Sequence, residues 1–276
     1  MTDAILLAIV GFVGGAFGSM VGLGGGVFMV PALALFMDVP IHQAIAASLL
    51  AVVATSTTAA AAYLRDDLTN LRLGMTLETA TVTGALAGGL AGAVLSRGVL
   101  SAVFGGVMVV VALYLLVRPL TGGPPVGEPE ALGALGASYY DCSLAKAVSY
   151  RVRRLPAGLG ASLIAGAVSG LLGVGGGFLK VPVMVLAMRV PVRAAVCTSS
   201  FMIGVTACAG AIVYLARGLV DPITAVPVVL GVVLGAYLGS RAAIRVRSSI
   251  LTVTLAVVLL ALAIQMILDA AGISVR

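Results

Sequence analysis

The chain has 276 residues, of which 61% are hydrophobic and only 9% are charged, and its mean hydropathy is +1.20. A soluble domain of this length needs far more charge to cover its surface, so the composition indicates a polytopic membrane protein. The net charge of +6 does not indicate a nucleic-acid partner, because the basic residues stand in short loops between apolar runs, where they set membrane orientation. The three cysteines and single histidine form no metal-ligand or disulfide pattern, so we expect no metal and no cofactor.

The N-terminal segment, MTDAILLAIVGFVGG, has an aspartate and no lysine or arginine before its apolar run. Cleavable signal peptides begin with basic residues, so we expect this segment to stay in the membrane. It continues into SMVGLGGGVFMVP at residues 19–31, where three adjacent glycines interrupt the apolar run. Glycine weakens a helix and permits turns, so we predict a broken helical segment over residues 4–37.

Three ordinary helices are predicted next, over residues 43–64, 72–96 and 99–118. Each is apolar and long enough for a hydrocarbon core of roughly 30 Å. Ser48 opens a cluster of hydroxyl side chains in the first of them, and these either donate to an oxyanion or bond back to the carbonyl one turn earlier. Glu78 is close to the start of the second helix, where we expect an interfacial role.

Residues 119–156 form a linker that is rich in glycine and proline and then becomes basic. Such a composition predicts a solvent-exposed segment that is partly structured at best. The chain is thereby divided into a first transmembrane repeat (1–118), a cytoplasmic linker (119–156) and a second transmembrane repeat (157–276).

The second half repeats the first at a constant offset of 151 residues. Its glycine motif, GLLGVGGGFLKVP at residues 170–182, predicts a second broken segment over 157–188. Three helices follow as before, over 194–216, 222–245 and 249–268. The residues that coincide at this offset include Gly24 with Gly175, Gly25 with Gly176, Gly26 with Gly177, Ser48 with Ser199, Thr55 with Thr206 and Tyr63 with Tyr214.

Each broken segment has two interpretations, a single interrupted crossing or a re-entrant hairpin that returns to its own side. Hairpins place twelve of the sixteen basic residues on one side and three on the other, with Lys180 in the membrane, whereas full crossings divide them nine to six. Cytoplasmic loops carry the excess of basic residues, so hairpins are favoured. The predicted fold is an all-α polytopic membrane protein of two inverted repeats, each a glycine-broken re-entrant hairpin plus three transmembrane helices, with both termini outside.

A helix that restarts after glycines presents unpaired backbone N–H groups and the positive end of its dipole, which together favour an anion. Non-helical backbone at membrane depth persists only inside protein or beside a wet cavity. Two such breaks at matched positions are typical of transporters with discontinuous helices, whereas plain close packing of glycines is the alternative. We therefore predict one anion near the midplane, bound by Gly24, Gly25 and Gly26 and by Gly175, Gly176 and Gly177.

Lys180 stands three residues past Gly177, in the first turn of the restarted helix, and its counterpart in the first half is Met29. A cation at the positive end of a helix dipole calls for an anion beside it, so we assign Lys180 to substrate binding with Ser48, Thr198 and Ser199. The alternative is a shallow hairpin from which Lys180 reaches the interface.

The doubled motif, GGAFGSMVGLGGGVFMVPAL with AGAVSGLLGVGGGFLKVPVM, each followed by a PxxxA…S segment, resembles the TauE/SafE sulfite exporter family, also called the toluene-sulfonate uptake permease superfamily. The resemblance covers nearly the whole chain except the linker. It implies a secondary transporter of sulfite, sulfonates or related sulfur-containing anions in a bacterial-type plasma membrane. Family members often have Thr-Ser where this chain has Ala47–Ser48, whereas Thr198–Ser199 keeps the pattern.

We expect a non-enzymatic transporter that works by alternating access, with the lipid bilayer and a small anion as partners and possible coupling to an ion. No GxxxxGK[ST] phosphate-binding loop is present, which argues against direct ATP hydrolysis. Two other classes stay open, a passive anion channel and an intramembrane enzyme built on Lys180 with Ser199 or Ser200.

Overall fold

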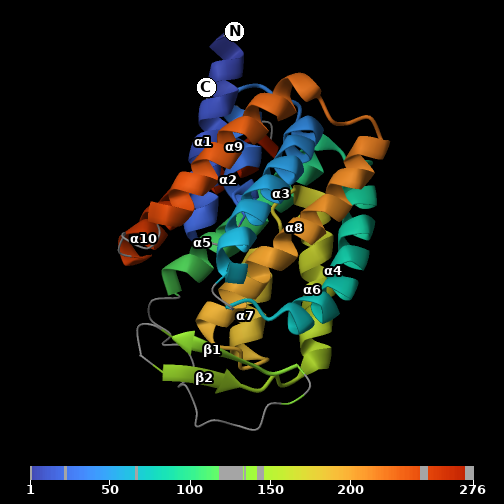
Figure 1. Ribbon diagram of the computed structural model, residues 1–276. Helices are drawn as coiled ribbons and strands as arrows, with labels where there is room; N and C mark the ends of the chain where they lie inside the picture. Colours follow the sequence, from blue (N-terminus) through green and yellow to red (C-terminus); the bar gives the residue numbers. More distant parts are fainter. Residues whose placement is uncertain are drawn as a thin grey trace.

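A computed structural model describes residues 2–21, 24–65, 68–117, 133, 135–141, 146–242 and 248–270. Within these residues the fold is a bundle of ten helices with one two-stranded antiparallel sheet at one end (Figure 1). Four of the described helices are long and apolar enough to cross a membrane. The elements are α1 (Thr2–Val21), α2 (Gly26–Phe36), α3 (Ile41–Arg65), α4 (Leu71–Gly92), α5 (Arg97–Val117), β1 (Ala137–Asp141), β2 (Lys146–Tyr150), α6 (Leu155–Leu172), α7 (Gly177–Leu186), α8 (Val192–Ala216), α9 (Pro222–Ala242) and α10 (Ser248–Ala270).

The all-α polytopic membrane fold predicted from the sequence is confirmed. Both predicted breaks are present, since α1 and α2 are separated at the first glycine triplet and α6 and α7 at the second. The six other predicted helices are present with ends that differ by at most four residues from the prediction. Residues 119–132, 134 and 142–145 of the predicted linker and residues 243–247 of the predicted cytoplasmic loop lie outside the described residues.

The second broken segment folds back on itself. The backbone N–H of Arg153, just before α6, donates to the carbonyl of Met188, just after α7, at 3.1 Å. A side-chain carbon added at Gly158 would lie 2.5 Å from the sulfur of Met188. The start of α6 and the end of α7 are therefore neighbours, so this segment is a helical hairpin.

The packing between the halves repeats at the same offset of 151 residues as the sequence. A side-chain carbon at Gly84 of α4 would lie 2.1 Å from the carbonyl oxygen of Leu163 in α6, and its counterpart at Gly235 of α9 would lie 2.0 Å from that of Phe12 in α1. Glycine is needed at both places because the helix backbones touch. Each hairpin thus packs against a helix of the other half.

The linker is more structured than the sequence predicted. Strands β1 and β2 pair Ala137 with Tyr150 and Asp141 with Lys146, and the hairpin covers one end of the helical bundle (Figure 1). Tyr139, Val148 and Tyr150 are buried in one apolar cluster with residues of α4, α7 and α8. The expectation of a solvent-exposed linker is therefore wrong for this part, because alternate strand residues turn an apolar face to the bundle.

Asn70 fastens this hairpin to the helices. Its side-chain oxygen caps α4 by accepting from the N–H of Leu73 at 3.0 Å. Its side-chain nitrogen donates to the carbonyl of Leu135 at 2.9 Å and to the hydroxyl of Tyr150 at 3.1 Å, and its backbone N–H donates to Thr198 Oγ1 of α8 at 3.0 Å. Asn70 is buried, so these bonds are shielded from water.

We expect Asn70→Ala to destabilise the folded protein by about 1–3 kcal/mol, since it removes a helix cap and leaves buried polar groups without partners. The measurement is thermal unfolding of the purified protein in detergent. Asn70→Ser serves as the control, because its hydroxyl oxygen is a good helix cap without an added charge while the amide donors to Leu135 and Tyr150 are lost. If the Asn70→Ala protein is as stable as wild type, the hydrogen bonds of Asn70 do not stabilise the packing of the β-hairpin against the helices.

Candidate functional site

The two glycine breaks meet at the centre of the molecule. Side-chain carbons added at Gly24 and at Gly175 would each approach the same two residues, Val52 of α3 and Ile203 of α8, at 2.8–3.2 Å. One added at Gly26 would lie 2.2 Å from the carbonyl oxygen of Gly173. Val52 and Ile203 are themselves counterparts at the offset of 151. The breaks are thus related positions packed directly against each other.

The backbone of each break has a conformation that favours glycine. Gly24, Gly25, Gly175 and Gly176 have φ angles of 83°, 75°, 85° and 71°. Gly25 and Gly176 are the N-cap residues of α2 and α7, and no side chain caps either helix. The first N–H groups of a helix have no acceptor within it, so Gly26 and Gly177 begin helices whose leading amides and dipole ends face the centre.

Ser48 and Ser199, the matched serines, have different surroundings. Both are fully buried. Ser48 Oγ donates to the carbonyl of Gly173 at 2.9 Å and so ties α3 to the second break. Ser199 Oγ has no hydrogen-bond partner among the described residues, and the counterpart of Gly173, which is Gly22, lies outside them. A buried hydroxyl without a partner is costly and indicates a place where a ligand can bind.

The remaining hydroxyls bond mostly to nearby backbone. Thr55, Thr57 and Ser200 donate to the carbonyl four residues earlier, which confirms the alternative offered for this cluster. Thr198 accepts from the N–H of Asn70, so the structure brings it to the β-hairpin junction.

A small pocket lies against the first break. Four of the side chains that line it carry hydroxyls, and all four hydroxyls donate to backbone carbonyls. In this arrangement, no hydroxyl hydrogen of the pocket is available to an anion. The lining residues are Gly18, Ser19, Gly24, Thr55, Ser56, Ala59, Ser200 and Ile203.

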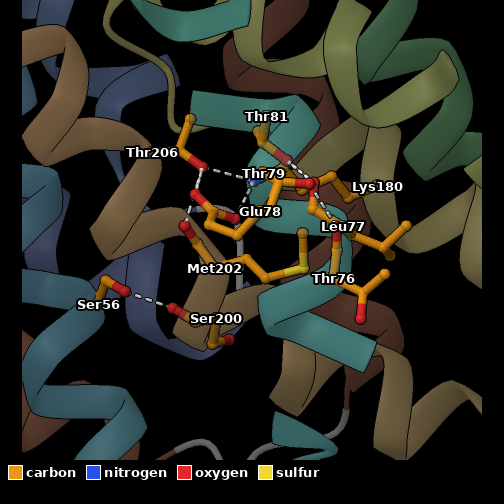
Figure 2. Close-up of polar contacts among 10 residues, drawn as sticks. All are labelled: Ser56, Thr76, Leu77, Glu78, Thr79, Thr81, Lys180, Ser200, Met202 and Thr206. Atoms are coloured by element: carbon orange, nitrogen blue, oxygen red, sulfur yellow. Dashed lines mark hydrogen bonds and ion pairs between the residues drawn. The ribbon is translucent and has the colours of Figure 1, made fainter. Parts of the chain in front are cut away.

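Lys180 lies inside the bundle and is 2% exposed. Its ammonium donates to Thr206 Oγ1 at 2.8 Å and lies 3.7 Å from Glu78 Oε2. Thr206 in turn donates to Glu78 Oε1 at 2.6 Å. Figure 2 shows the three side chains meeting from α7, α8 and α4. The side chain is therefore directed to a buried carboxylate, which contradicts the snorkelling alternative.

Glu78 is the functional candidate that sequence reasoning missed. The sequence predicted an interfacial role, but Glu78 is 3% exposed and seven residues into α4, on the face that packs against α8. Its Oε2 atom accepts no hydrogen bond among the described residues. The signal was present in the sequence, because Glu78 is the one carboxylate within the predicted spans and Lys180 needs a counter-ion.

The positions related to this site by the repeat are mostly apolar. At the offset of 151 residues, Lys180 corresponds to Met29, Glu78 to Val229 and Thr206 to Thr55. Met29 is fully buried, and Thr55 is buried with its hydroxyl bonded to the carbonyl of Ala51. The site is therefore asymmetric, as predicted, because the charged pair joins Glu78 of the first half to Lys180 of the second, whereas their counterparts Val229 and Met29 are apolar.

A sequence model of the family described as "Sulfite exporter TauE/SafE" matches residues 7–266 of this chain. Among curated proteins, a probable membrane transporter protein YunE of Bacillus subtilis is 28% identical, with 82% of this chain and 84% of the relative covered. A second from that organism, YdhB, is 24% identical over 82% and 85%. A probable membrane transporter protein of Xylella fastidiosa is 36% identical over 38% and 41%. No solved structure matches the chain.

Proposed function

This chain belongs to the TauE/SafE sulfite exporter family, and its relatives are named membrane transporters. We propose that it is a secondary transporter of sulfite or related small sulfur-containing anions such as sulfonates, located in the plasma membrane. The observation that carries the proposal is a buried cation, Lys180, in the first turn of a helix that begins at one of two matched glycine breaks.

We place the anion near the centre of the bundle and assign three kinds of donor to it. The leading amides of α2 and α7 follow Gly25 and Gly176, Ser199 has an unpartnered buried hydroxyl, and Lys180 supplies a full positive charge. Charge-assisted hydrogen bonds are the stronger ones, so Lys180 dominates the affinity. Gly24, Gly26, Gly175 and Gly177 allow the close approach that a small oxyanion needs.

Transport proceeds by alternating access between two inverted repeats. Gly204 of α8 lies near Ser56 of α3, and Gly210 lies near Leu49, so the two helices run antiparallel. Because α3 and α8 are counterparts in the repeat, their opposite directions support an inverted relation between the two halves. The N-terminus and the β-hairpin lie at opposite ends of the bundle, which supports outward termini and a cytoplasmic linker (Figure 1). The breaks pack tightly here, so binding requires them to separate, and a movement of that kind is what alternating access supplies.

The alternative functions fit less well. The hydrogen bonds of Lys180 and Ser200 go to Thr206 and to the carbonyl of Val196, so these residues do not form the nucleophilic dyad that an intramembrane enzyme would use. A passive channel needs a continuous wet path, whereas the side chains of Val52 and Ile203 fill the centre.

The test is uptake of radiolabelled anions into proteoliposomes that contain the purified protein. We expect saturable uptake and counterflow of sulfite or of a small sulfonate such as methanesulfonate, and weaker uptake of chloride. Liposomes without protein give the background. Flux that rises linearly with concentration would indicate a channel, and the absence of protein-dependent flux for the whole panel would refute the proposed function.

A further inference from the structure

We propose that Glu78 is a proton-binding residue that couples anion transport to the movement of one proton. This inference rests on the proposed function and adds the coupling ion to it. In the structure, the Glu78 carboxylate forms an ion pair with the Lys180 ammonium. When Glu78 takes up a proton from solution, Lys180 is released and can bind the substrate anion.

The geometry of the pair is loose enough for an exchange of partners. An ammonium has three N–H donors, and the hydrogen bond from Lys180 is to Thr206. The Glu78 carboxylate is at ion-pair distance, 3.7 Å, but its Oε2 atom accepts no hydrogen bond among the described residues. A buried ion pair with excellent geometry would satisfy both oxygens. Lys180 therefore keeps donor capacity toward a second acceptor.

The positions related by the repeat show that this place in the fold does not need charge. At the offset of 151 residues, Met29 of α2 corresponds to Lys180 and Val229 of α9 corresponds to Glu78, and both counterparts are apolar. Replacing a buried ion pair with apolar residues of similar size is often neutral or stabilising. A structural role alone therefore does not explain the pair, and charged residues at membrane depth mark sites of function.

Charge balance determines the stoichiometry. The pair of Glu78 carboxylate and Lys180 ammonium carries no net charge. A monovalent anion that bound beside it would add a full negative charge to a poorly solvated interior, which is strongly unfavourable. If the carboxylate gains one proton as the anion arrives, the loaded site is again neutral. Loss of the proton on the other side restores the pair and expels the anion, so one proton crosses with each monovalent anion.

Few other groups near the pair can titrate or carry charge. In the described parts of the helices that pack around it, α6 has none and α7 has only Lys180. Helix α4 adds Arg72, which is exposed at its start. The others are Arg193, Cys197, Cys208 and Tyr214 on α8, His42 on α3, and Tyr139 and Tyr150 of the β-hairpin. The carboxylate in contact with Lys180 is Glu78.

The experiment uses methanesulfonate, which stays a monovalent anion across the pH range, so that any effect of pH belongs to the protein. For wild type in proteoliposomes, a gradient of about one pH unit, acid outside, should raise the ratio of inside to outside anion about tenfold if one proton accompanies each anion. A pH-sensitive dye inside the vesicles should report acidification during uptake. Glu78→Gln should abolish the gradient-driven accumulation while counterflow of labelled for unlabelled methanesulfonate persists.

Two control variants separate coupling from folding. Glu78→Asp keeps a carboxylate and should keep gradient-driven uptake. Asp269→Asn neutralises the carboxylate of the exposed pair with Arg97, 3.2 Å apart, and should behave as wild type. Wild-type uptake without acidification, or accumulation by Glu78→Gln that equals wild type, would overturn the coupling while leaving the transporter assignment intact. Wild type without any saturable counterflow would overturn both.

Discussion

Lys180→Met should weaken binding of sulfite or methanesulfonate by about tenfold to about a hundredfold, because hydrogen bonds to charged groups contribute about 1.5–3 kcal/mol. Lys180 is buried in the first turn of α7, and we propose that it supplies the positive charge of the anion site. The substitution introduces the residue that the first half has at this position, Met29. Isothermal titration of the purified proteins measures the change in Kd.

The same substitution affects stability, which provides its control. Removing one partner of a buried ion pair destabilises a protein by about 3–5 kcal/mol, so Lys180→Met alone should lower the unfolding temperature. The double variant Glu78→Val/Lys180→Met introduces the residues found at the two related positions, Val229 and Met29, and should recover most of that loss. If the double variant is less stable than Lys180→Met, the two residues are not coupled as the geometry indicates.

We expect Gly176→Val to abolish transport. Gly176 has a φ angle of 71°, which a β-branched residue adopts only with strain, and an added side-chain carbon would lie 2.7 Å from the carbonyl oxygen of Ala165. The valine would also cover the amides that begin α7. The measurement is anion counterflow in proteoliposomes, made on protein whose folding is verified by its size-exclusion profile and unfolding temperature.

The matched control for this prediction is Gly106→Val. Gly106 lies in α5, is exposed, and has no atom within 4 Å of an added side-chain carbon. The same change of residue type should therefore leave counterflow unaltered. A folded Gly176→Val protein that transports as fast as Gly106→Val would show that the break takes no part in anion movement.

The sequence was sufficient to predict the helices and both breaks, because those features follow from local composition. Long apolar runs define membrane helices, and the glycine triplets mark the places where α1 gives way to α2 and α6 to α7. The repeat at an offset of 151 residues also predicted that Ser48 and Ser199 would be buried at related places. Whether these residues and glycines bind an anion stays a prediction.

The residues that were missed depend on contacts between segments distant in sequence. Glu78 and Lys180 are separated by 102 positions, and only the packing of α4 and α7 around α8 brings them together. The β-hairpin was missed for a similar reason, since its buried tyrosines gain their stability from packing against the helix ends. Strand propensity depends on such context far more than a membrane span does.

Binding of the substrate anion by Lys180, next to the glycine breaks, can be measured by isothermal titration of sulfite and methanesulfonate. The two proteins to compare are wild type and Glu78→Val/Lys180→Met, the variant in which charge balance is kept. We expect saturable binding to wild type and binding to the folded double variant that is weaker by about tenfold or more. Equal affinity for the two proteins would show that Lys180 does not bind the anion and would place the anion site elsewhere.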